Sequence, residues 1–150
     1  MTPTVELLIA QHQEVLARLA TVEASLMNND ATDFAEFARF LETDVGPHFA
    51  LEEQALFPVL VRHLGADHGP LAVMYAEHAS FRRLLAALGA AVQAGDAAAQ
   101  AVHAVELVEL LRAHIAKEDH VLFPMAGRIL NADEVAEVNE RARLLIGAAA

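Results

Sequence analysis

The sequence contains no cysteine, and aromatic residues make up only 5% of its 150 residues. Without cysteine the chain can form neither disulfides nor thiolate metal sites, so any bound metal must be held by nitrogen and oxygen donors. The absence of thiols also fits a reducing compartment. A composition rich in alanine and leucine but poor in aromatics favours helices over a β-sandwich, so we expect an all-α fold.

Basic residues and long apolar runs are scarce as well. Ten Lys and Arg residues against 21 Asp and Glu give a formal net charge of -11, which would repel a phosphate backbone and makes nucleic acid an unsuitable partner. Polar residues such as His12 and Arg82 interrupt the apolar stretches before they reach the roughly 20 residues of a membrane span. Residues 1–10 lack the features of a signal peptide, so we expect a cytoplasmic protein with no membrane partner.

The sequence does contain a repeat of metal-binding residue types. Hydrophobic residues make up 55% of the chain, which is enough for one core, and we expect a single domain over residues 1–150. Within it, a set of three residues recurs 66 positions later, and the same shift relates two Leu-Phe-Pro runs. Such a repeat indicates two helical hairpins that face each other. The repeated residues are His12, His48 and Glu52, which recur as His78, His114 and Glu118.

Capping signals place the ends of the first two long helices. Thr2 as N-cap and Pro3 at the first helical position predict a helix that ends at the polar residues 28–30. A second helix begins near Asp33. Pro47 should kink it immediately before His48, since proline removes a backbone hydrogen bond and clashes with the preceding turn.

Similar signals place the remaining helices. A third helix is expected from Pro70 to about Gly95, and a fourth follows Asp96 as N-cap and runs towards residue 130 with a bend at Pro124. Asn131 has the spacing from residue 134 that a capping box requires, ahead of a short fifth helix. The sequence therefore predicts an up-down antiparallel four-helix bundle with a short C-terminal fifth helix.

The repeated residues would meet at one level of this bundle. Each of the four histidines lies about 15 to 18 residues from the turn of its own hairpin. Within the second and fourth helices His and Glu are four residues apart, which rotates them by only about 40° about the axis. Imidazole nitrogens and carboxylate oxygens suit iron, manganese or zinc. Two carboxylates that can each bridge two ions indicate two metals.

Any one of these six residues alone would more often be a buried, hydrogen-bonded polar side chain than a ligand. Together they favour metal, because burying four imidazoles and two carboxylates without it would cost several kcal/mol in desolvation. Three further histidines, His63, His68 and His103, are interpreted as surface or capping groups in the first two cases and as an inward-facing polar residue in the third. Glu53 and His120 are expected to be solvated or to lie behind the ligands.

The runs HQEVLARL, HFALEEQALFP, EHASFRRLL and HIAKEDHVLFP resemble the hemerythrin-like family, the HHE cation-binding domains. The resemblance covers the chain from His12 to Pro124. It implies a four-helix bundle that holds two iron ions in an oxo- or hydroxo-bridged, non-haem centre, with manganese or zinc as substitutes. Carried over by position, it implies terminal ligands at the four histidines listed above and bridging carboxylates at Glu52 and Glu118.

Three positions depart from the oxygen-carrying members or leave the ligand set open. Met74 stands where those members have a further histidine, and a thioether is a poor ligand for ferric iron, so one coordination position is expected to be open or filled by water. Tyr75 could replace that histidine as a phenolate, or be a packing residue. Asp119 stands at the carriers' carboxylate position, five residues after the histidine, but Glu118 keeps the symmetry with Glu52.

The resemblance implies a protein that binds or reacts with O2, H2O2 or NO in sensing or detoxification, with catalase-like peroxide consumption as one enzymatic form. Its partner would be that small-molecule oxidant, and the protein itself a monomer or homodimer. A non-catalytic iron sensor or store is the first alternative, and a reversible O2 carrier is the second. A metal-free helical interaction module is a further class, which metal analysis would separate from the others.

Overall fold

The computed structural model describes residues 2–149, and every regular element among them is helical. The predicted all-α class is therefore confirmed. Short π-helical turns interrupt some of the α-helices. The elements are α1 (Pro3–Met27), α2 (Phe34–Phe40), η1 (Leu41–Val45), α3 (Gly46–Leu51), η2 (Glu52–Leu56), α4 (Phe57–Leu64), α5 (Gly69–Ala94), α6 (Ala97–Lys117), η3 (Glu118–Leu122), α7 (Phe123–Ile129) and α8 (Ala132–Ala149).

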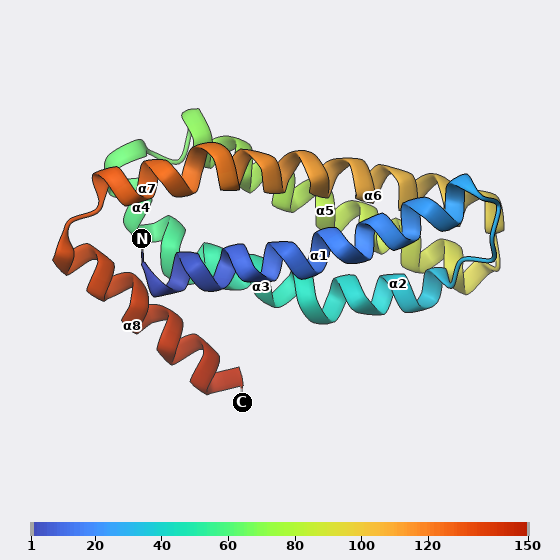
Figure 1. Ribbon diagram of the computed structural model, residues 1–150, viewed down its shortest axis with the longest axis horizontal. Helices are drawn as coiled ribbons and strands as arrows, with labels where there is room; N and C mark the ends of the chain where they lie inside the picture. Colours follow the sequence, from blue (N-terminus) through green and yellow to red (C-terminus); the bar gives the residue numbers. More distant parts are fainter. Residues whose placement is uncertain (1, 150) are drawn as a thin grey trace.

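The long helices lie along a common axis. In Figure 1, α1, the α2–α4 path, α5 and the α6–α7 path extend along the long axis of the molecule, and the connections α1–α2 and α5–α6 lie at the same end. Helix α5 packs along α6, and α1 also contacts α6. Helix α8 runs obliquely away from the opposite end, where it contacts α1, η2 and α4. The two sequence repeats thus lie side by side.

Side-chain caps fix the helix starts where the sequence predicts them. The side chains of Thr2, Asp33 and Asp96 accept hydrogen bonds from backbone N–H groups three residues further on. Each cap satisfies one of the free N–H groups of a first helical turn. The Asn131 side chain accepts from the Glu134 N–H at 2.9 Å, and the Glu134 carboxylate accepts from the Asn131 N–H at 3.0 Å. This predicted capping box starts α8, which spans 18 residues and is longer than the short helix expected.

Each of the three π-helical turns ends two residues before a proline, namely Pro47, Pro58 or Pro124. A proline has no N–H, and its ring clashes with the carbonyl four residues earlier. In all three cases that carbonyl lies inside the π turn, where the wider helix accommodates the ring. The freed carbonyl of Gln54 accepts a hydrogen bond from Arg141 of α8 at 3.4 Å. The helices thus contain π turns at Pro47 and Pro124, where the sequence predicted a kink or bend.

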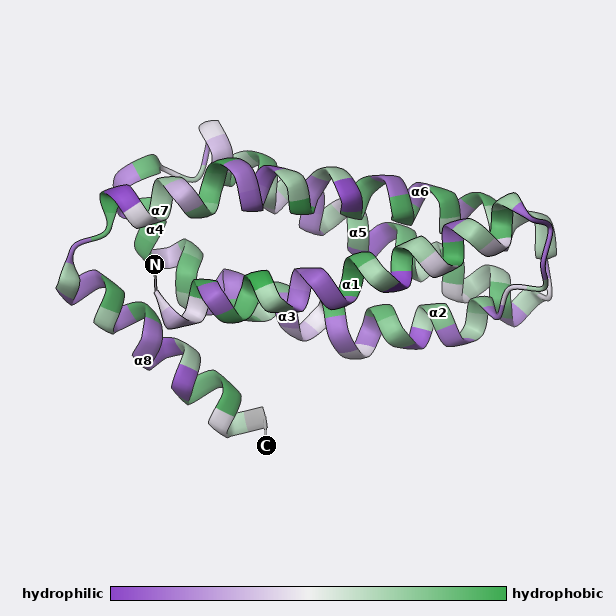
Figure 2. Cartoon of the chain, in the orientation of Figure 1, coloured by the Kyte–Doolittle hydropathy of each residue, from purple (hydrophilic) through white to green (hydrophobic). Residues whose placement is uncertain are grey.

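The apolar core consists of two clusters with the predicted ligands between them. Along α1, Leu8 belongs to one cluster and Val15 to the other, and His12 lies between these positions. Along α5, Met74 and Phe81 flank the ligand in the same way. Figure 2 shows hydrophobic and hydrophilic residues alternating along the helices, as expected where each helix buries one face. The predicted ligands thus form a polar layer that lies between the two apolar clusters along the helices.

Candidate metal centre

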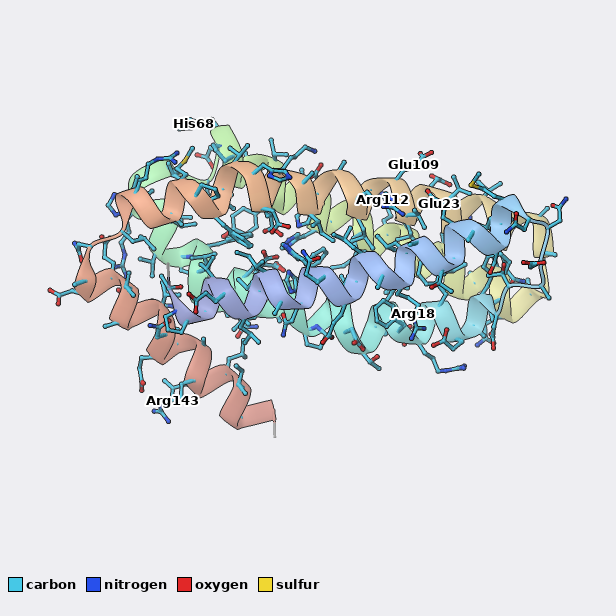
Figure 3. The ribbon with its side chains drawn as sticks, viewed as in Figure 1. Arg18, Glu23, His68, Glu109, Arg112 and Arg143 are labelled. Atoms are coloured by element: carbon cyan, nitrogen blue, oxygen red, sulfur yellow. The ribbon has the colours of Figure 1, made fainter. Side chains whose placement is uncertain are left out.

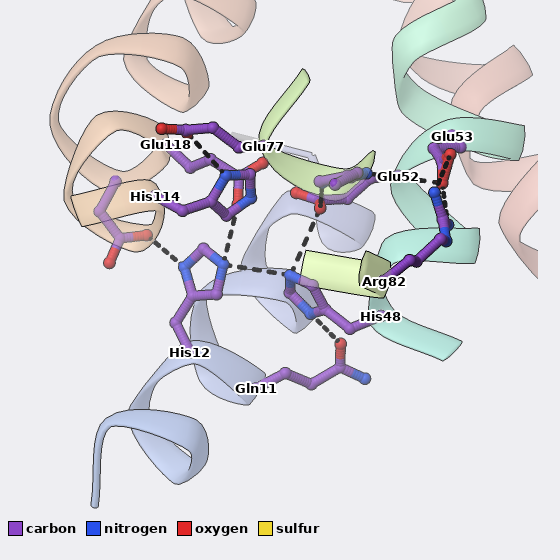
Figure 4. Close-up of polar contacts among 11 residues, drawn as sticks. Gln11, His12, His48, Glu52, Glu53, Glu77, Arg82, His114 and Glu118 are labelled. Atoms are coloured by element: carbon purple, nitrogen blue, oxygen red, sulfur yellow. Dashed lines mark hydrogen bonds and ion pairs between the residues drawn. The ribbon is translucent and has the colours of Figure 1, made fainter. Parts of the chain in front are cut away.

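All six side chains predicted as ligands meet in the interior. Each is at most 4% exposed to solvent. They come from both sequence repeats, which supply two histidines and one glutamate each, and most of them can be followed in Figure 4. The helical elements that contain these residues are α1 for His12, α3 for His48, η2 for Glu52, α5 for His78, α6 for His114 and η3 for Glu118.

The six side chains form two donor groups that share both carboxylates. One group contains His12 and His48, and the other contains His78 and His114; within each group the four donor atoms lie within 4.8 Å of one another. Oε1 of Glu118 lies 3.2 Å from Nε2 of His12 and 3.2 Å from Nε2 of His114. Each such carboxylate therefore spans the two groups, an arrangement suited to a pair of cations.

Glu52 spans the groups in the same way as Glu118. Its Oε1 lies 3.2 Å from Nε2 of His78 and 3.6 Å from Nε2 of His48. Glu52 and Glu118 thus each contact one histidine of the first repeat and one histidine of the second. The carboxylates consequently tie together four helical paths, and both halves of the chain are needed to complete either donor group.

A second layer of acceptors faces the outer nitrogen of each histidine. Nδ1 of His12 lies 2.7 Å from the Asp119 carboxylate, and Nδ1 of His48 lies 2.8 Å from the side-chain oxygen of Gln11. These oxygens only accept, so Nδ1 donates its proton to them and the Nε2 lone pair points inward. Asp119, which the sequence left open as a ligand, therefore orients His12.

The second repeat has the corresponding contacts. Nδ1 of His114 lies 3.0 Å from the Glu77 carboxylate, and Nδ1 of His78 lies 3.5 Å from the Glu53 carboxylate. Lys117 forms a short ion pair with Glu77, and Arg82 forms one with Glu53. Glu53 was expected to be solvated or to lie behind the ligands, and it lies behind His78.

This acceptor layer also follows the 66-residue shift. Gln11 corresponds to Glu77, and Glu53 corresponds to Asp119. Sequence reasoning missed Gln11 and Glu77, although each directly precedes the lone histidine of its repeat and this position could have revealed them. The one chemical difference is that His48 has a neutral amide partner, whereas its counterpart His114 has a carboxylate.

The Leu-Phe-Pro runs supply aromatic walls for the opposite repeat. Phe123 stacks on His12 at 5.6 Å between ring centroids, and Phe57 stacks on His78, also at 5.6 Å. A further ring, Phe49, lies parallel to His78 at 3.7 Å. These rings restrict rotation of the imidazoles and exclude water from the polar layer. The repeated phenylalanines therefore belong to the site.

The inward-pointing atoms lack hydrogen-bond partners among the described residues. These atoms include both carboxylate oxygens of Glu52 and Glu118 and Nε2 of His114. Nε2 of His12 also faces Nε2 of His48 at 3.1 Å, so two lone pairs converge once the outer nitrogens hold the protons. Buried polar atoms without partners cost about 1–3 kcal/mol each, and more when charged. A cation bound between them would remove that cost, so the donor set fits metal.

The pKa values of the clustered groups in the metal-free protein are shifted from their usual ranges. Burial and the charge of Glu118 raise the pKa of Glu52 well above its usual range. Burial also acts to raise the pKa of Glu118, but its close contacts with the Glu52 carboxyl and with the neighbouring histidines lower it well below the usual range. Burial, with the charges of neighbouring histidines, lowers the pKa of His48 to about 3 and that of His78 to about 4. Neutral imidazoles are the form that binds metal, so His48 and His78 are already in that form. Burial also acts to lower the pKa of His12, but the carboxylates of Glu118 and Asp119 raise it above its usual value, so metal must displace a proton there.

Met74 and Tyr75 contact the same apolar cluster but differ in burial. Met74 is buried in an apolar cluster that includes Leu71 and Phe57. The Tyr75 ring lies edge-on against Phe57 at 5.4 Å and is only partly buried. Burial and the charge of Glu53 raise the pKa of the Tyr75 phenol, which opposes phenolate formation in the metal-free protein. This placement favours the packing interpretation of Tyr75.

The remaining histidines lie outside the cluster. Nε2 of His63 lies 2.6 Å from the Glu134 carboxylate, and His68 is the N-cap residue of α5. The expectation that His103 faces inward is wrong: its side chain is 27% exposed and lies 3.2 Å from the exposed Glu106 carboxylate. His120 is exposed on η3.

The fold and the cluster define an all-helical protein with buried His and Glu groups suited to metal binding. The family described as the Hemerythrin HHE cation binding domain matches residues 4–126, and the chain belongs to this family. The matched segment contains all six clustered residues. Comparisons with curated proteins and with solved structures gave no match. Among the described residues, every helix is too short or too polar to cross a lipid bilayer.

Proposed function

We propose that the chain is a non-haem di-iron protein that binds or reacts with O2, H2O2 or NO in sensing or detoxification. The observation that carries the proposal is the pair of donor groups that share Glu52 and Glu118. Two imidazoles and two shared carboxylates suit iron, with manganese or zinc as substitutes. We also propose that the helices form an up-down antiparallel four-helix bundle and one domain over residues 1–150.

The side chains have separate roles in this proposal. The four Nε2 atoms would hold the two irons as terminal donors, together with Glu52 and Glu118 as the shared carboxylates. Two irons held there would supply the electrons for reduction of a small oxidant and would themselves be oxidised. Asp119 and Glu77 hold the protons of His12 and His114 on Nδ1, which keeps each Nε2 lone pair directed inward. The phenylalanine rings keep water away from the reacting side.

Met74 supports reaction with oxidants over pure reversible O2 carriage. The oxygen carriers that the chain resembles have a further histidine at this position. Here the thioether is a poor ligand for ferric iron, and its side chain lies in an apolar cluster. The position it leaves open belongs to the group of His78 and His114, where an external molecule could bind.

A non-catalytic iron sensor is the second candidate, and the unpartnered buried atoms favour it. Glu52 and Glu118 have no hydrogen-bond partners for their oxygens among the described residues, so metal binding and stability of the fold are coupled. Iron would then change the order of the protein and its affinity for a partner. Strong stabilisation by Fe(II) without consumption of any oxidant would identify this function.

The test combines iron content with the optical spectrum before and after peroxide. We expect about two irons per chain after anaerobic Fe(II) loading, a spectral change on addition of peroxide, and loss of both in His78→Ala. His120→Ala is the matched control, because this histidine is exposed. Reversible absorption of O2 without peroxide consumption would support a carrier instead. Less than about one metal per chain in the wild type would overturn the proposal.

A further inference from the structure

A cavity of about 350 Å³ leads from the surface to one of the clustered histidines. It lies between α1, α3 and α8, and the ligand it reaches is His48. This histidine is 4% exposed, whereas the other three are at most 1% exposed. Two other hollows, one around Arg18 and one around Met27, contact none of the six clustered residues. A much smaller cavity, of about 10 Å³, touches His12, His48 and His114, so the larger of the two cavities that reach the cluster meets it at His48.

The polar residues along the cavity become less exposed from its mouth inward. Glu14, Thr43 and Asp44 are exposed, Gln11 is partly buried and His48 is buried. The Thr43 hydroxyl donates to the Asp44 carboxylate at 2.8 Å. The carboxylates of Glu14 and Asp44 form no salt bridge within the described part of the chain. Carboxylate, hydroxyl and amide oxygens are the donors that divalent cations accept before they reach nitrogen ligands.

The outer end of the cavity adjoins a wider hollow. This hollow has a volume of about 660 Å³ and shares Glu14, Thr43 and Asp44 with the cavity. Arg18 on its rim is paired with Glu36 and lies over the Phe40 ring, at 4.5 Å from the centroid. Arg39 also lines this hollow, so the three carboxylates of Glu14, Glu36 and Asp44 face two guanidiniums there and leave a negative balance that attracts cations.

At the inner end of the cavity, His48 differs from the other three clustered histidines in the partner of its outer nitrogen. His48 is held by the neutral Gln11 amide at 2.8 Å, whereas carboxylates face the outer nitrogens of the other three histidines. Hydrogen bonds to charged partners are roughly twice as strong as those between neutral groups. Among the clustered histidines His48 alone lines this cavity, and its outer nitrogen is held by one neutral hydrogen bond to Gln11, which lies directly beside it in Figure 4.

We propose that this cavity is the port through which divalent metal cations reach the buried cluster. Glu14 and Asp44 attract the cation at the mouth, Gln11 and His48 receive it at the inner end, and Leu145 and Ile146 of α8 form the apolar wall. The net charge of -11 and the acidic mouth make the route unfavourable for anions. The inference rests on the proposed metal-binding function of the cluster, and it concerns the rate of loading rather than the affinity.

The test measures how fast Co(II) enters the metal-free protein, by stopped-flow absorption of the bound ion. Glu14→Gln combined with Asp44→Asn removes the charge at the mouth and retains the shape. We expect loading roughly tenfold slower at low salt, a smaller difference at high salt, and unchanged final Co(II) content. The matched control is Glu23→Gln with Glu109→Gln, which neutralises two carboxylates at a hollow that touches no ligand (Figure 3).

A second pair of variants tests the wall of the port. The Ile146 side chain is 50% exposed, so its replacement leaves the core intact. Ile146→Trp should slow both Co(II) entry and its removal by a chelator, and Ile146→Ala should accelerate both. If the neutralised mouth and Ile146→Trp both load at the wild-type rate, the port is overturned while the metal centre stands. If wild-type protein takes up no Co(II), both proposals fail.

Discussion

Two adjacent acidic residues, Glu118 and Asp119, have different chemical roles despite their similar charge. Glu118 is fully buried, and its Oε1 faces Nε2 of His12 and of His114. Asp119 faces the outer Nδ1 of His12. Sequence reasoning from the 66-residue repeat favoured Glu118 as the ligand, and resemblance to the carriers left Asp119 open. The geometry supports separate roles as bridge and as orienting residue.

The first prediction separates these two roles by isosteric substitution. Glu118→Gln should bind less than about one metal per chain, because a neutral amide cannot bridge two cations. Asp119→Asn should retain the full metal content but bind it roughly 10- to 100-fold more weakly, since it weakens the hydrogen bond that orients His12. Metal analysis and a competition titration with a chelator measure both effects.

The control for this pair is Asp67→Asn, an exposed acidic residue in the turn before α5. It should leave metal content and affinity at the wild-type level. Full metal content in Glu118→Gln together with loss of metal in Asp119→Asn would reverse the assignment of the bridging carboxylate.

At the scale of the elements, the sequence predicted the helix starts better than the helix interiors. Thr2, Asp33 and Asp96 carry capping side chains, which are local signals that tertiary contacts did not override. The positions of the six clustered residues were also predictable, because the repeat fixes both their helical face and their depth. The caps depend on short-range spacing, and the ligand positions depend on the 66-residue repeat.

The π turns and the orienting residues were not predicted. A proline within a helix indicates a disturbance, but whether the chain ends, kinks or widens depends on what accepts the freed carbonyl. At Pro58 that carbonyl is Gln54, and its partner Arg141 lies 87 residues away. Gln11 and Glu77 likewise contact His48 and His114 at a separation of 37 residues. These pairs join residues far apart in the sequence, and the one sign of them in the sequence is that Gln11 and Glu77 share the 66-residue shift.

The second prediction concerns Pro58 and the π turn that begins at Glu52. A π turn holds one residue more than an α turn, which rotates the preceding residues against the following ones by about 100°. This rotation is needed for Glu52 and Phe57 both to face the cluster. Pro58→Ala supplies an N–H for Gln54 and should allow the turn to revert to α. We expect roughly tenfold weaker metal binding with no loss of metal-free stability.

Metal titration and thermal melting of the metal-free variant measure these two effects. Pro70→Ala is the matched control, since this proline lies in the first turn of α5, where a missing N–H has no consequence. Weaker metal binding in Pro70→Ala than in Pro58→Ala would contradict the link between the π turn and the site.

At the scale of the whole molecule, the cluster joins two halves that the sequence repeats. Each donor group contains histidines from one repeat only but carboxylates from both. The orienting contacts of Glu53 with His78 and of Asp119 with His12 also cross between the repeats. Removal of metal therefore leaves a polar layer between the two apolar clusters, and the stability of the whole fold should depend on metal.

The third prediction is the size of this dependence. With free Fe(II) at about 1,000 times its Kd, binding to the folded state alone contributes about 4 kcal/mol. For a chain of this length roughly 2–4 °C of melting temperature corresponds to each kcal/mol. The melting temperature should therefore rise by roughly 8–16 °C on anaerobic loading, as measured by circular dichroism.

The informative comparison is the double variant Glu52→Leu with Glu118→Leu. Glu52 and Glu118 are both acidic, and their buried oxygens have no partners among the described residues, which costs about 1–3 kcal/mol or more for each group and is avoided by leucine. The metal-free double variant should consequently melt at or above the temperature of the metal-free wild type, and Fe(II) should not shift it. This outcome would show that the carboxylates are retained for metal and not for the fold. Equal melting of the wild type with and without Fe(II) would instead mean that the polar layer is stable without a bound cation.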